Sequence, residues 1–221
     1  MDIVDALNTR ITARAFRPDP IDRRTLESIM EAALRAPSWA NTQPWEVYLA
    51  GGVVLNRLRE AYVSNLKNCV ARHPDLAAPK QWPAAQQKRM ETLRSERTAT
   101  LERICLDKSE LKDLSEMNYH FFHAPVVAYI CMDRTLTPWS IFDLGLFSQS
   151  LMLAARHFGV DSAPAVTLVA HPDLIREELK IPDDLQIIIG IALGYADTGH
   201  PQNQFRTPRR SVQEAVTFKG I

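Results

Sequence analysis

A helical period of apolar residues follows Asp22, which is a good helix N-cap. Apolar side chains recur at positions i, i+3, i+4, i+7 and i+8 of this segment, so one face of the helix is predicted to be buried. Pro37 cannot continue a helix and marks its end. Residues 2–10 predict a shorter helix with apolar side chains on one side. The apolar positions of the longer helix are Leu26, Ile29, Met30, Ala33 and Leu34.

Unbroken apolar runs predict buried strands. The clearest run spans residues 126–132, and a second spans residues 185–196. Residues 46–52 predict a strand that ends at two glycines, and residues 165–169 predict a short further strand.

Two helical segments lie between strands in the second half of the chain. Residues 141–158 are apolar on almost every side, which is typical of a helix at a domain centre or a subunit interface, and Gly159 is the expected C-cap. Another helix is expected between Pro172 and Pro182. Strands and helices alternate without the regular rhythm of a doubly wound sheet. The pattern therefore predicts an α+β fold with helices on both faces of a small mixed sheet.

Residues 53–117 differ from the rest because they are mostly polar and helical in character. A first helix is followed by a break at residues 73–83 and by a second helix at about residues 84–106. This composition predicts a partly exposed helical excursion that acts as a lid or contacts a partner. The polar and aromatic candidates for ligand contact in or beside it are His73, Trp82, Arg89, Arg94 and Tyr119.

Composition is typical of a single soluble domain. The chain has 221 residues, 46% of them hydrophobic and 24% charged, with a formal net charge of zero. Nucleic-acid binding needs a net basic face, so no nucleic-acid partner is expected. No apolar run approaches the roughly 18 residues of a membrane span, and the acidic first residues do not resemble a signal peptide. Three widely spaced cysteines favour reduced thiols, so a cytoplasmic protein is predicted.

Motifs for several kinds of chemistry are absent from the sequence. It has no Gly-x-Gly-x-x-Gly turn, no phosphate-binding Gly-x-x-x-x-Gly-Lys loop and no Gly-x-Ser-x-Gly nucleophile elbow. His120 and His123 lie one helical turn apart, but without a nearby carboxylate or third ligand a structural or surface role is favoured over a metal site. We therefore assign no catalytic side chain and no metal ligand.

Arginines cluster near both ends of the chain. Arg10 and Arg14 flank Thr12 where the first helix is expected to end. A guanidinium binds phosphate through two parallel hydrogen bonds, and a threonine hydroxyl can add another. The tail carries the second cluster, Arg206, Arg209 and Arg210. Taken alone, these clusters fit solvated surface charge better than a cofactor site.

Residues 36–45, Ala-Pro-Ser-Trp-Ala-Asn-Thr-Gln-Pro-Trp, combine amides with indoles at a helix–strand junction. The amides of Asn41 and Gln43 can donate and accept hydrogen bonds, as the edge of a flat heterocycle requires. Trp39 and Trp45 supply planar apolar walls. A well-packed loop accounts for Trp45 but poorly for the polar residues around it. The loop therefore favours a cofactor site.

With these residues considered together, the sequence resembles the FMN-dependent nitroreductase family. The resemblance begins with Thr-Arg-Ile-Thr-Ala-Arg-Ala-Phe at residues 9–16 and continues with the loop at residues 36–45. It extends through residues 122–133, 143–164 and 172–197 to the motif Asn-Gln-Phe-Arg-Thr-Pro-Arg-Arg in the tail. It covers nearly the whole chain, and the residues between about 60 and 115 are the least diagnostic.

The resemblance implies one FMN-binding domain over residues 1–221, with a nitroreductase-like three-layer α/β/α architecture and an extended C-terminal tail. It also implies a homodimer with two FMN molecules at the subunit interface, each site built from both chains, and NADH or NADPH as electron donor. The residues implied from one chain are Arg10, Thr12, Arg14, Ala163, Pro164, Ala165 and Arg209. Those implied from the partner are Pro37, Ser38, Trp39, Asn41 and Gln43.

Three positions depart from the family pattern. Thr12 replaces the usual Ser and keeps the hydroxyl, whereas Ala165 replaces a frequent Gln and loses a polar contact. Trp39 is bulkier than the common Ser or Gly and would narrow the pocket over the flavin. Whether Arg209 or Arg210 binds the phosphate depends on the register of the tail.

The implied reaction is reduction of a nitroaromatic or quinone-type acceptor by NAD(P)H. Hydride passes through flavin N5 in a ping-pong cycle, and a backbone N–H of residues 163–165 reaches N5. The helix at 141–158 would form the dimer core, and residues 53–117 would cover the active site. Alternatives are another flavin-dependent reduction on the same scaffold (dehalogenation, ene-reduction or flavin reduction) and a non-catalytic flavin-binding protein.

Overall fold

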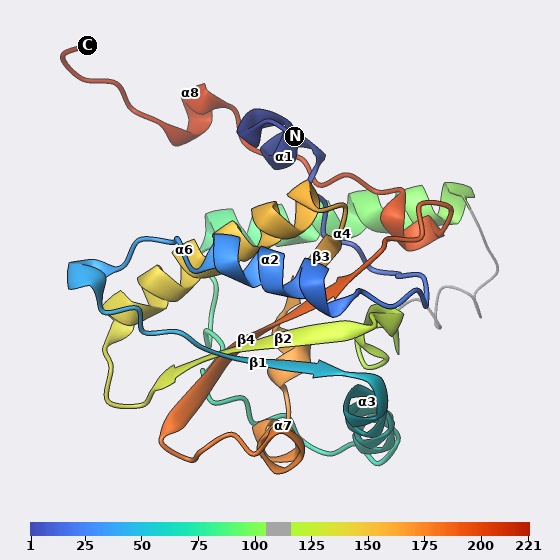
Figure 1. Ribbon diagram of the computed structural model, residues 1–221. Helices are drawn as coiled ribbons and strands as arrows, with labels where there is room; N and C mark the ends of the chain where they lie inside the picture. Colours follow the sequence, from blue (N-terminus) through green and yellow to red (C-terminus); the bar gives the residue numbers. More distant parts are fainter. Residues whose placement is uncertain (105–115) are drawn as a thin grey trace.

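A computed structural model gives the structure of residues 1–104 and 116–221 (Figure 1). Residues 105–115, which include the end of the predicted helix at 84–106 and part of the excursion, lie outside the described residues. The helices are α1 (Ile3–Thr9), α2 (Arg23–Ala33), α3 (Gly52–Lys67), α4 (Ala84–Ile104), α6 (Pro138–His157), α7 (Pro172–Leu179) and α8 (Val212–Ala215). The strands are β1 (Glu46–Gly51), β2 (Val126–Asp133), β3 (Asp161–Ala165) and β4 (Leu185–Gly194).

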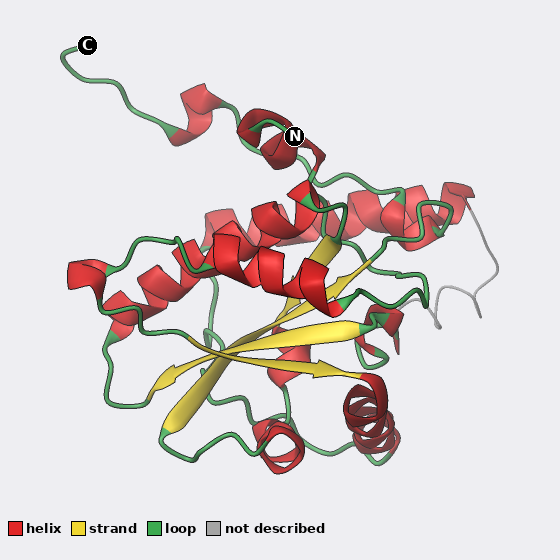
Figure 2. Cartoon of the chain, viewed as in Figure 1, coloured by secondary structure: helices red, strands yellow, loops and turns green. Residues whose placement is uncertain are grey.

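Four strands form one sheet in the order β1-β2-β4-β3 (Figure 2). The α+β class is confirmed, but all three strand pairings are antiparallel, so the expectation of a mixed sheet is wrong for the described strands. The reason lies in the connections. β2 begins beside the end of β1, where Gly51 faces Val126, as in any antiparallel pair. Alternation of strands and helices along a sequence does not by itself require parallel crossovers.

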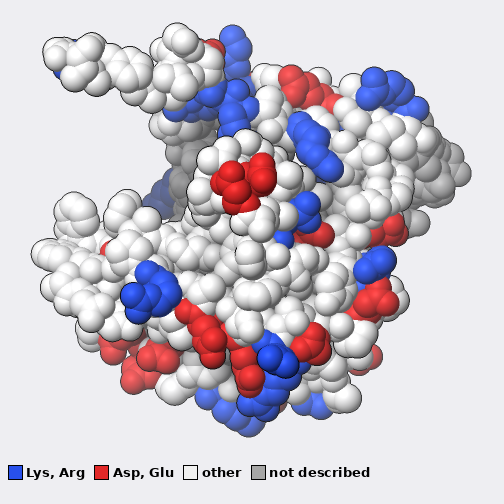
Figure 3. Space-filling view, turned by 45° about the horizontal axis from the view of Figure 1, so that its top comes forward, with Lys and Arg blue, Asp and Glu red and all other residues white. Residues whose placement is uncertain are grey.

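Both ends of the chain lie on the same side of the molecule. Figure 1 shows α1 beside the C-terminal segment, which leaves the body as an extended tail that carries α8. In the space-filling view, Lys and Arg side chains gather where this tail leaves the body, next to a hollow in that face (Figure 3).

Helices cover both faces of the sheet, as the predicted three layers require. α2 and α6 lie on one face, and α3 and α7 lie on the other (Figure 1). Side chains of β2 alternate between the two cores because successive strand residues point to opposite faces. Those facing α3 and α7 are Val127, Tyr129 and Cys131. Those facing α2 and α6 are Val126, Ala128, Ile130 and Met132.

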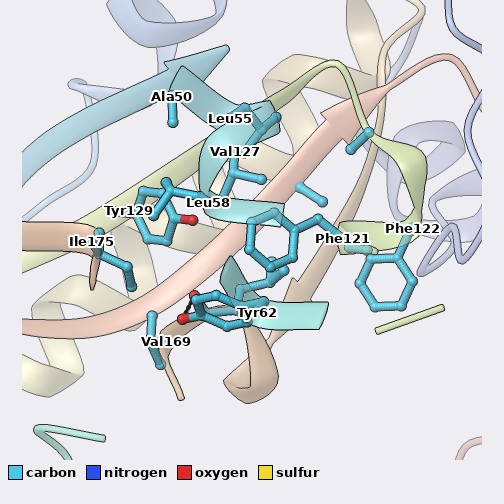
Figure 4. Close-up of a cluster of buried hydrophobic side chains, with 14 of the residues drawn as sticks. Ala50, Leu55, Leu58, Tyr62, Phe121, Phe122, Val127, Tyr129, Val169 and Ile175 are labelled. Atoms are coloured by element: carbon cyan, nitrogen blue, oxygen red, sulfur yellow. Dashed lines mark hydrogen bonds between the residues drawn. The ribbon is translucent and has the colours of Figure 1, made fainter. Parts of the chain in front are cut away.

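The core beneath α3 contains the buried hydroxyl group of Tyr62, which is hydrogen-bonded to the backbone. Tyr62 donates its hydroxyl proton to the Leu168 carbonyl oxygen at 2.9 Å and accepts a bond from the His171 backbone N–H at 3.2 Å. Figure 4 shows its ring among the aliphatic and aromatic side chains of this cluster. Burial raises the pKa of this phenol, so Tyr62 stays neutral.

A β-bulge and one glycine shape the centre of the sheet. The register between β2 and β4 shifts at Ile130 and Cys131, so that Ile188 and Ile189 both pack in the core beneath α2 and α6. Further along β4, a Cβ atom on Gly190 would lie 2.5 Å from the Cβ of Leu168. Only glycine fits there without displacing the backbone.

Two predicted elements need correction. The strand expected at residues 165–169 is wrong: β3 occupies Asp161–Ala165, and Val166–Val169 form a 3-10 helix. An apolar run of this length suits either element, and the turn buries Leu168 and Val169 against β4. The helix expected from residue 141 begins at Pro138, with Thr137 as N-cap. No helix in the described ranges is long and apolar enough to cross a membrane.

Candidate functional site

The two arginine clusters predicted from the ends of the chain meet in the structure. Arg10 is the C-cap residue of α1, and its Nη1 is buried without a hydrogen-bond partner. Burial lowers the pKa of Arg10, and the positive charge of Arg209 lowers it further, so the two guanidinium groups are electrostatic neighbours. None of the ion pairs among the described residues involves Arg10, Arg14 or Arg209. Within residues 1–104 and 116–221, this positive charge therefore has no counter-ion.

The segment after α1 is fixed beside the edge strand β3. Thr12 forms an isolated parallel bridge with Ser162, and the Ala13 N–H donates to the Ser162 carbonyl at 3.0 Å. The Arg14 N–H donates to Asn203 Oδ1 at 2.7 Å. Arg10, Thr12 and Arg14 are thereby held next to the first residues of β3.

β3 itself offers backbone groups on its outer side. It pairs only with β4 among the described strands, with Ala163 opposite Ala192, Pro164 opposite Ile191 and Ala165 opposite Gly190. The hydroxyl of Ser162, at the start of this segment, is buried and has no hydrogen-bond partner.

The predicted loop between α2 and β1 has an unusual backbone. Ala40, Asn41 and Gln43 have φ angles of 49°, 58° and 45°, in the left-handed region that residues other than glycine seldom adopt. The Gln43 N–H donates to Ser38 Oγ at 2.9 Å and holds the loop in this shape. Strained conformations that the surroundings maintain are common at binding sites.

Beside this loop lies an apolar pocket of about 380 Å³. Trp39 and Trp139 form one wall, with their rings in an edge-to-face contact at 5.8 Å between centroids. Asp143 of α6, 4% exposed, accepts a hydrogen bond from the Trp39 N–H at 3.2 Å. We call this the apolar pocket; its lining residues are Pro37, Ser38, Trp39, Trp139, Phe142, Asp143 and Leu146.

Trp45 does not belong to this pocket. Its ring is buried and stacks on Phe147 of α6 with centroids 5.0 Å apart. The interpretation that close packing accounts for Trp45 is confirmed, and the residue anchors the start of β1 in the core.

The predicted site residues thus form two separate groups. Arg10, Thr12, Arg14 and Arg209 lie with β3, whereas residues 37–43 lie with the start of α6. All of these residues are described, and no hydrogen bond, ion pair or shared pocket joins the two groups within one chain.

A second cavity, of about 510 Å³, lies between α4 and the segments that carry Arg14 and Phe205. We call it the basic cavity, because Arg14, Arg94 and Arg97 all line it. The other excursion candidates lie elsewhere. His73 pairs with Asp173 on α7, Tyr119 accepts a bond from Arg72, and Trp82 and Arg89 are exposed and line neither cavity.

Comparison with known proteins identifies the family to which the chain belongs. The sequence model of the Nitroreductase family matches residues 7–195. The chain belongs to the nitroreductase family. The resemblance predicted from the sequence motifs is therefore confirmed.

Individual nitroreductases are similar to this chain along nearly their whole length. The 4-nitrobenzoate reductase of Pseudomonas putida is 34% identical over 96% of this chain and 93% of its own length. The nitrobenzene nitroreductase of Ectopseudomonas oleovorans is 31% identical over 98% and 96%. A solved FMN and NADPH-dependent nitroreductase, NfnB from sphigopyxis sp. strain HMH, superposes with a TM-score of 0.91 at 28% identity, covering 100% of both chains.

Several polar residues at the sites of this nitroreductase were not predicted from its sequence. Asn203 ties the arginine segment to the C-terminal segment, since its side-chain amide also donates to Ala15 O and Asp197 O at 2.8 Å each. Asp143 and Arg97 likewise act through tertiary contacts. The only sequence signal for Asp143 is a single acid in an apolar helix.

Proposed function

We propose that this nitroreductase-family chain is an FMN-dependent oxidoreductase that uses NAD(P)H to reduce nitroaromatic or quinone-type acceptors. The observation that carries the proposal is the buried, unpartnered Nη1 of Arg10 near Arg209, a cation site without a counter-ion in the described parts of the chain. The names of the similar proteins, two nitroaromatic reductases and an FMN and NADPH-dependent nitroreductase, support it. The similarity to the NADPH-dependent nitroreductase favours NADPH as the electron donor of this chain.

The residues present fit the cofactor. The phosphate of FMN would bind to Arg10 and Arg209, with the Thr12 hydroxyl and Arg14 toward the ribityl chain. Arg209 suits this role better than Arg210, because the charge of Arg209 is near enough to lower the pKa of Arg10. Residues 163–165 of the edge strand would lie along the isoalloxazine ring with their outer backbone groups.

The second group of residues would serve the partner subunit in a homodimer. Trp39, Trp139 and Phe142 are each more than 60% exposed, and such a contiguous apolar surface is typical of an interface. In this arrangement Pro37, Ser38, Asn41 and Gln43 face the partner's flavin and complete a site that one chain does not build alone. α6 would supply the interface core.

The chemistry that bound FMN supplies is transfer of reducing equivalents from the nicotinamide to the acceptor. The chain's own residues hold the cofactor, orient its ring and limit access to it, and no side chain is needed as a nucleophile or a general acid. Donor and acceptor would use the same space in turn, which predicts ping-pong kinetics.

We further propose that residues 1–221 form a single domain. Within the excursion expected at residues 53–117, α3 packs on the sheet, and α4 is the part that would cover the flavin. The protein would act in the cytoplasm. We expect no nucleic-acid partner, because the net charge of the chain is zero.

Purification tests the proposal. The protein should carry or take up one FMN per chain. Without oxygen, it should sustain turnover of NADPH or NADH only when a nitroaromatic or quinone is present, with parallel double-reciprocal lines. Turnover of halophenols, enones or free flavin in preference to nitroaromatics would favour another reduction on this scaffold. Bound FMN that neither nucleotide reduces would indicate a non-catalytic flavoprotein.

A further inference from the structure

The basic cavity combines positive charge with an apolar wall. Arg97 on α4 and Arg14 on the N-terminal segment approach it from two sides, and Arg94 lies one helical turn from Arg97. Leu93, Leu101 and Phe205 supply apolar surface. The volume of about 510 Å³ lies within the range of small-molecule sites.

The charges of this cavity have no counter-ion among the residues that the structure describes. Arg97 donates to the side-chain oxygen of Gln202, which is neutral, and Arg14 donates to the backbone carbonyl of Thr12. Within the described part of the chain, none of Arg14, Arg94 and Arg97 takes part in an ion pair.

Electrostatics agree with this geometry. Burial and the nearby charge of Arg14 lower the pKa of Arg97 to about 10, and burial also lowers that of Arg14. Both groups remain protonated at neutral pH, so two like charges share a half-buried space. A bound anion relieves their repulsion and accepts N–H donors of Arg97.

The position and the walls of the cavity indicate which anion. Arg14 belongs to the segment held beside β3, so the cavity adjoins the proposed flavin site, while the FMN phosphate is assigned to Arg10 and Arg209. A carboxylate is planar and accepts the paired N–H groups of a guanidinium. The apolar wall suits the aromatic ring that would carry it.

We infer that the acceptor of this enzyme is a nitroaromatic that bears a carboxylate, and that Arg97 binds this carboxylate in the basic cavity, where the charge of Arg14 adds attraction while its side chain serves the flavin. The inference rests on the proposed function and specifies its substrate class. Arg97 and Arg94 would act as specificity-determining residues supplied by the excursion.

The test compares 4-nitrobenzoate with 4-nitrobenzamide, which has the same shape without the charge. In the FMN-loaded wild type, kcat/KM should be at least about 10-fold higher for the nitrobenzoate. Arg97→Gln should reduce this ratio about 10-fold or more, and Arg97→Lys, which keeps the charge, should preserve part of it. Arg103→Gln, which removes an exposed charge from the same helix outside the cavity, should leave the ratio unchanged.

A binding measurement separates this inference from the proposed function. Calorimetric titration with benzoate, which cannot be reduced, should show binding to the wild type that Arg97→Gln weakens about 10-fold, whether or not nitroaromatics are turned over. Equal use of nitrobenzoate and nitrobenzamide by an active, FMN-loaded enzyme would overturn the inference alone. The inference would also be overturned if Arg97→Gln changed the preference for NADPH over NADH but left the ratio of nitrobenzoate to nitrobenzamide turnover unaltered. The cavity would then bind the additional phosphate of NADPH.

Discussion

Replacing Arg10 by methionine should weaken the binding of FMN without destabilising the protein that lacks it. The long methionine side chain fills most of the space of the arginine but carries no charge. In the absence of an anion, Arg10 is partly desolvated, repelled by Arg209 and unpartnered at Nη1. Removing its charge therefore leaves the melting temperature of the flavin-free protein unchanged or raises it.

The loss of affinity can be estimated from the contact that disappears. A hydrogen bond to a charged group contributes about 1.5–3 kcal/mol, which corresponds to a roughly 10- to 150-fold rise in the Kd for FMN. Riboflavin lacks the phosphate, so its Kd should hardly change in Arg10→Met.

The assay is a fluorescence titration of FMN and of riboflavin into wild type and Arg10→Met, a cycle that isolates the pair of guanidinium and phosphate. The wild type should prefer FMN, and the variant should lose most of that preference. Arg24→Met, at an exposed arginine of α2, is the matched control. Equal weakening of both ligands would show that Arg10 does not address the phosphate.

Substitutions at three further positions test other parts of the structure. Trp45→Ala removes the ring stacked on Phe147 and should lower the free energy of unfolding by about 3–5 kcal/mol in a urea titration; a loss below about 1 kcal/mol would contradict its core role. Burial opposes ionisation of Asp75, but hydrogen bonds from Arg176, the β4 backbone and Arg134 outweigh it and lower the pKa of Asp75 in the folded protein. The ionised carboxylate therefore stabilises the fold, and this stabilisation is lost as the pH falls through the folded pKa. Asp75→Asn should cost about 3 kcal/mol at pH 7, and the deficit should shrink below about pH 4; a deficit independent of pH would refute this. Asn41→Ala should weaken FMN binding about 5-fold while sedimentation still shows the dimer, and Asn41→Gly, which suits the left-handed backbone, should do the same if the amide is what matters.

Local pattern was sufficient for the elements that bury one regular face. The helical spacing after Asp22 predicted α2, and the apolar run at 126–132 predicted a strand that faces two cores. Short apolar runs carry less information, which is why residues 166–169 were mistaken for strand. Polar α4 has one buried residue, Leu101, so no periodicity marked the face on which Arg97 lies.

The residues of the candidate sites also divide into those that a local sequence pattern marks and those that it does not. Arg10, Thr12 and Arg14 could be proposed as cofactor-binding residues because they stand within five positions of one another in a motif that resembles the family signature. Asn203 and Asp143 were not, because each acts on a backbone group far away in sequence, at Arg14 and Trp39. Such contacts exist only once the chain has folded.

The most direct test of the flavoenzyme assignment is anaerobic reduction of the FMN-loaded protein. Stoichiometric NADPH or NADH should bleach the visible flavin band, and one equivalent of a nitroaromatic acceptor should then restore it before any further nucleotide is added. A flavin band that persists after addition of both nucleotides, or a reduced protein that no nitroaromatic reoxidises, would contradict the account.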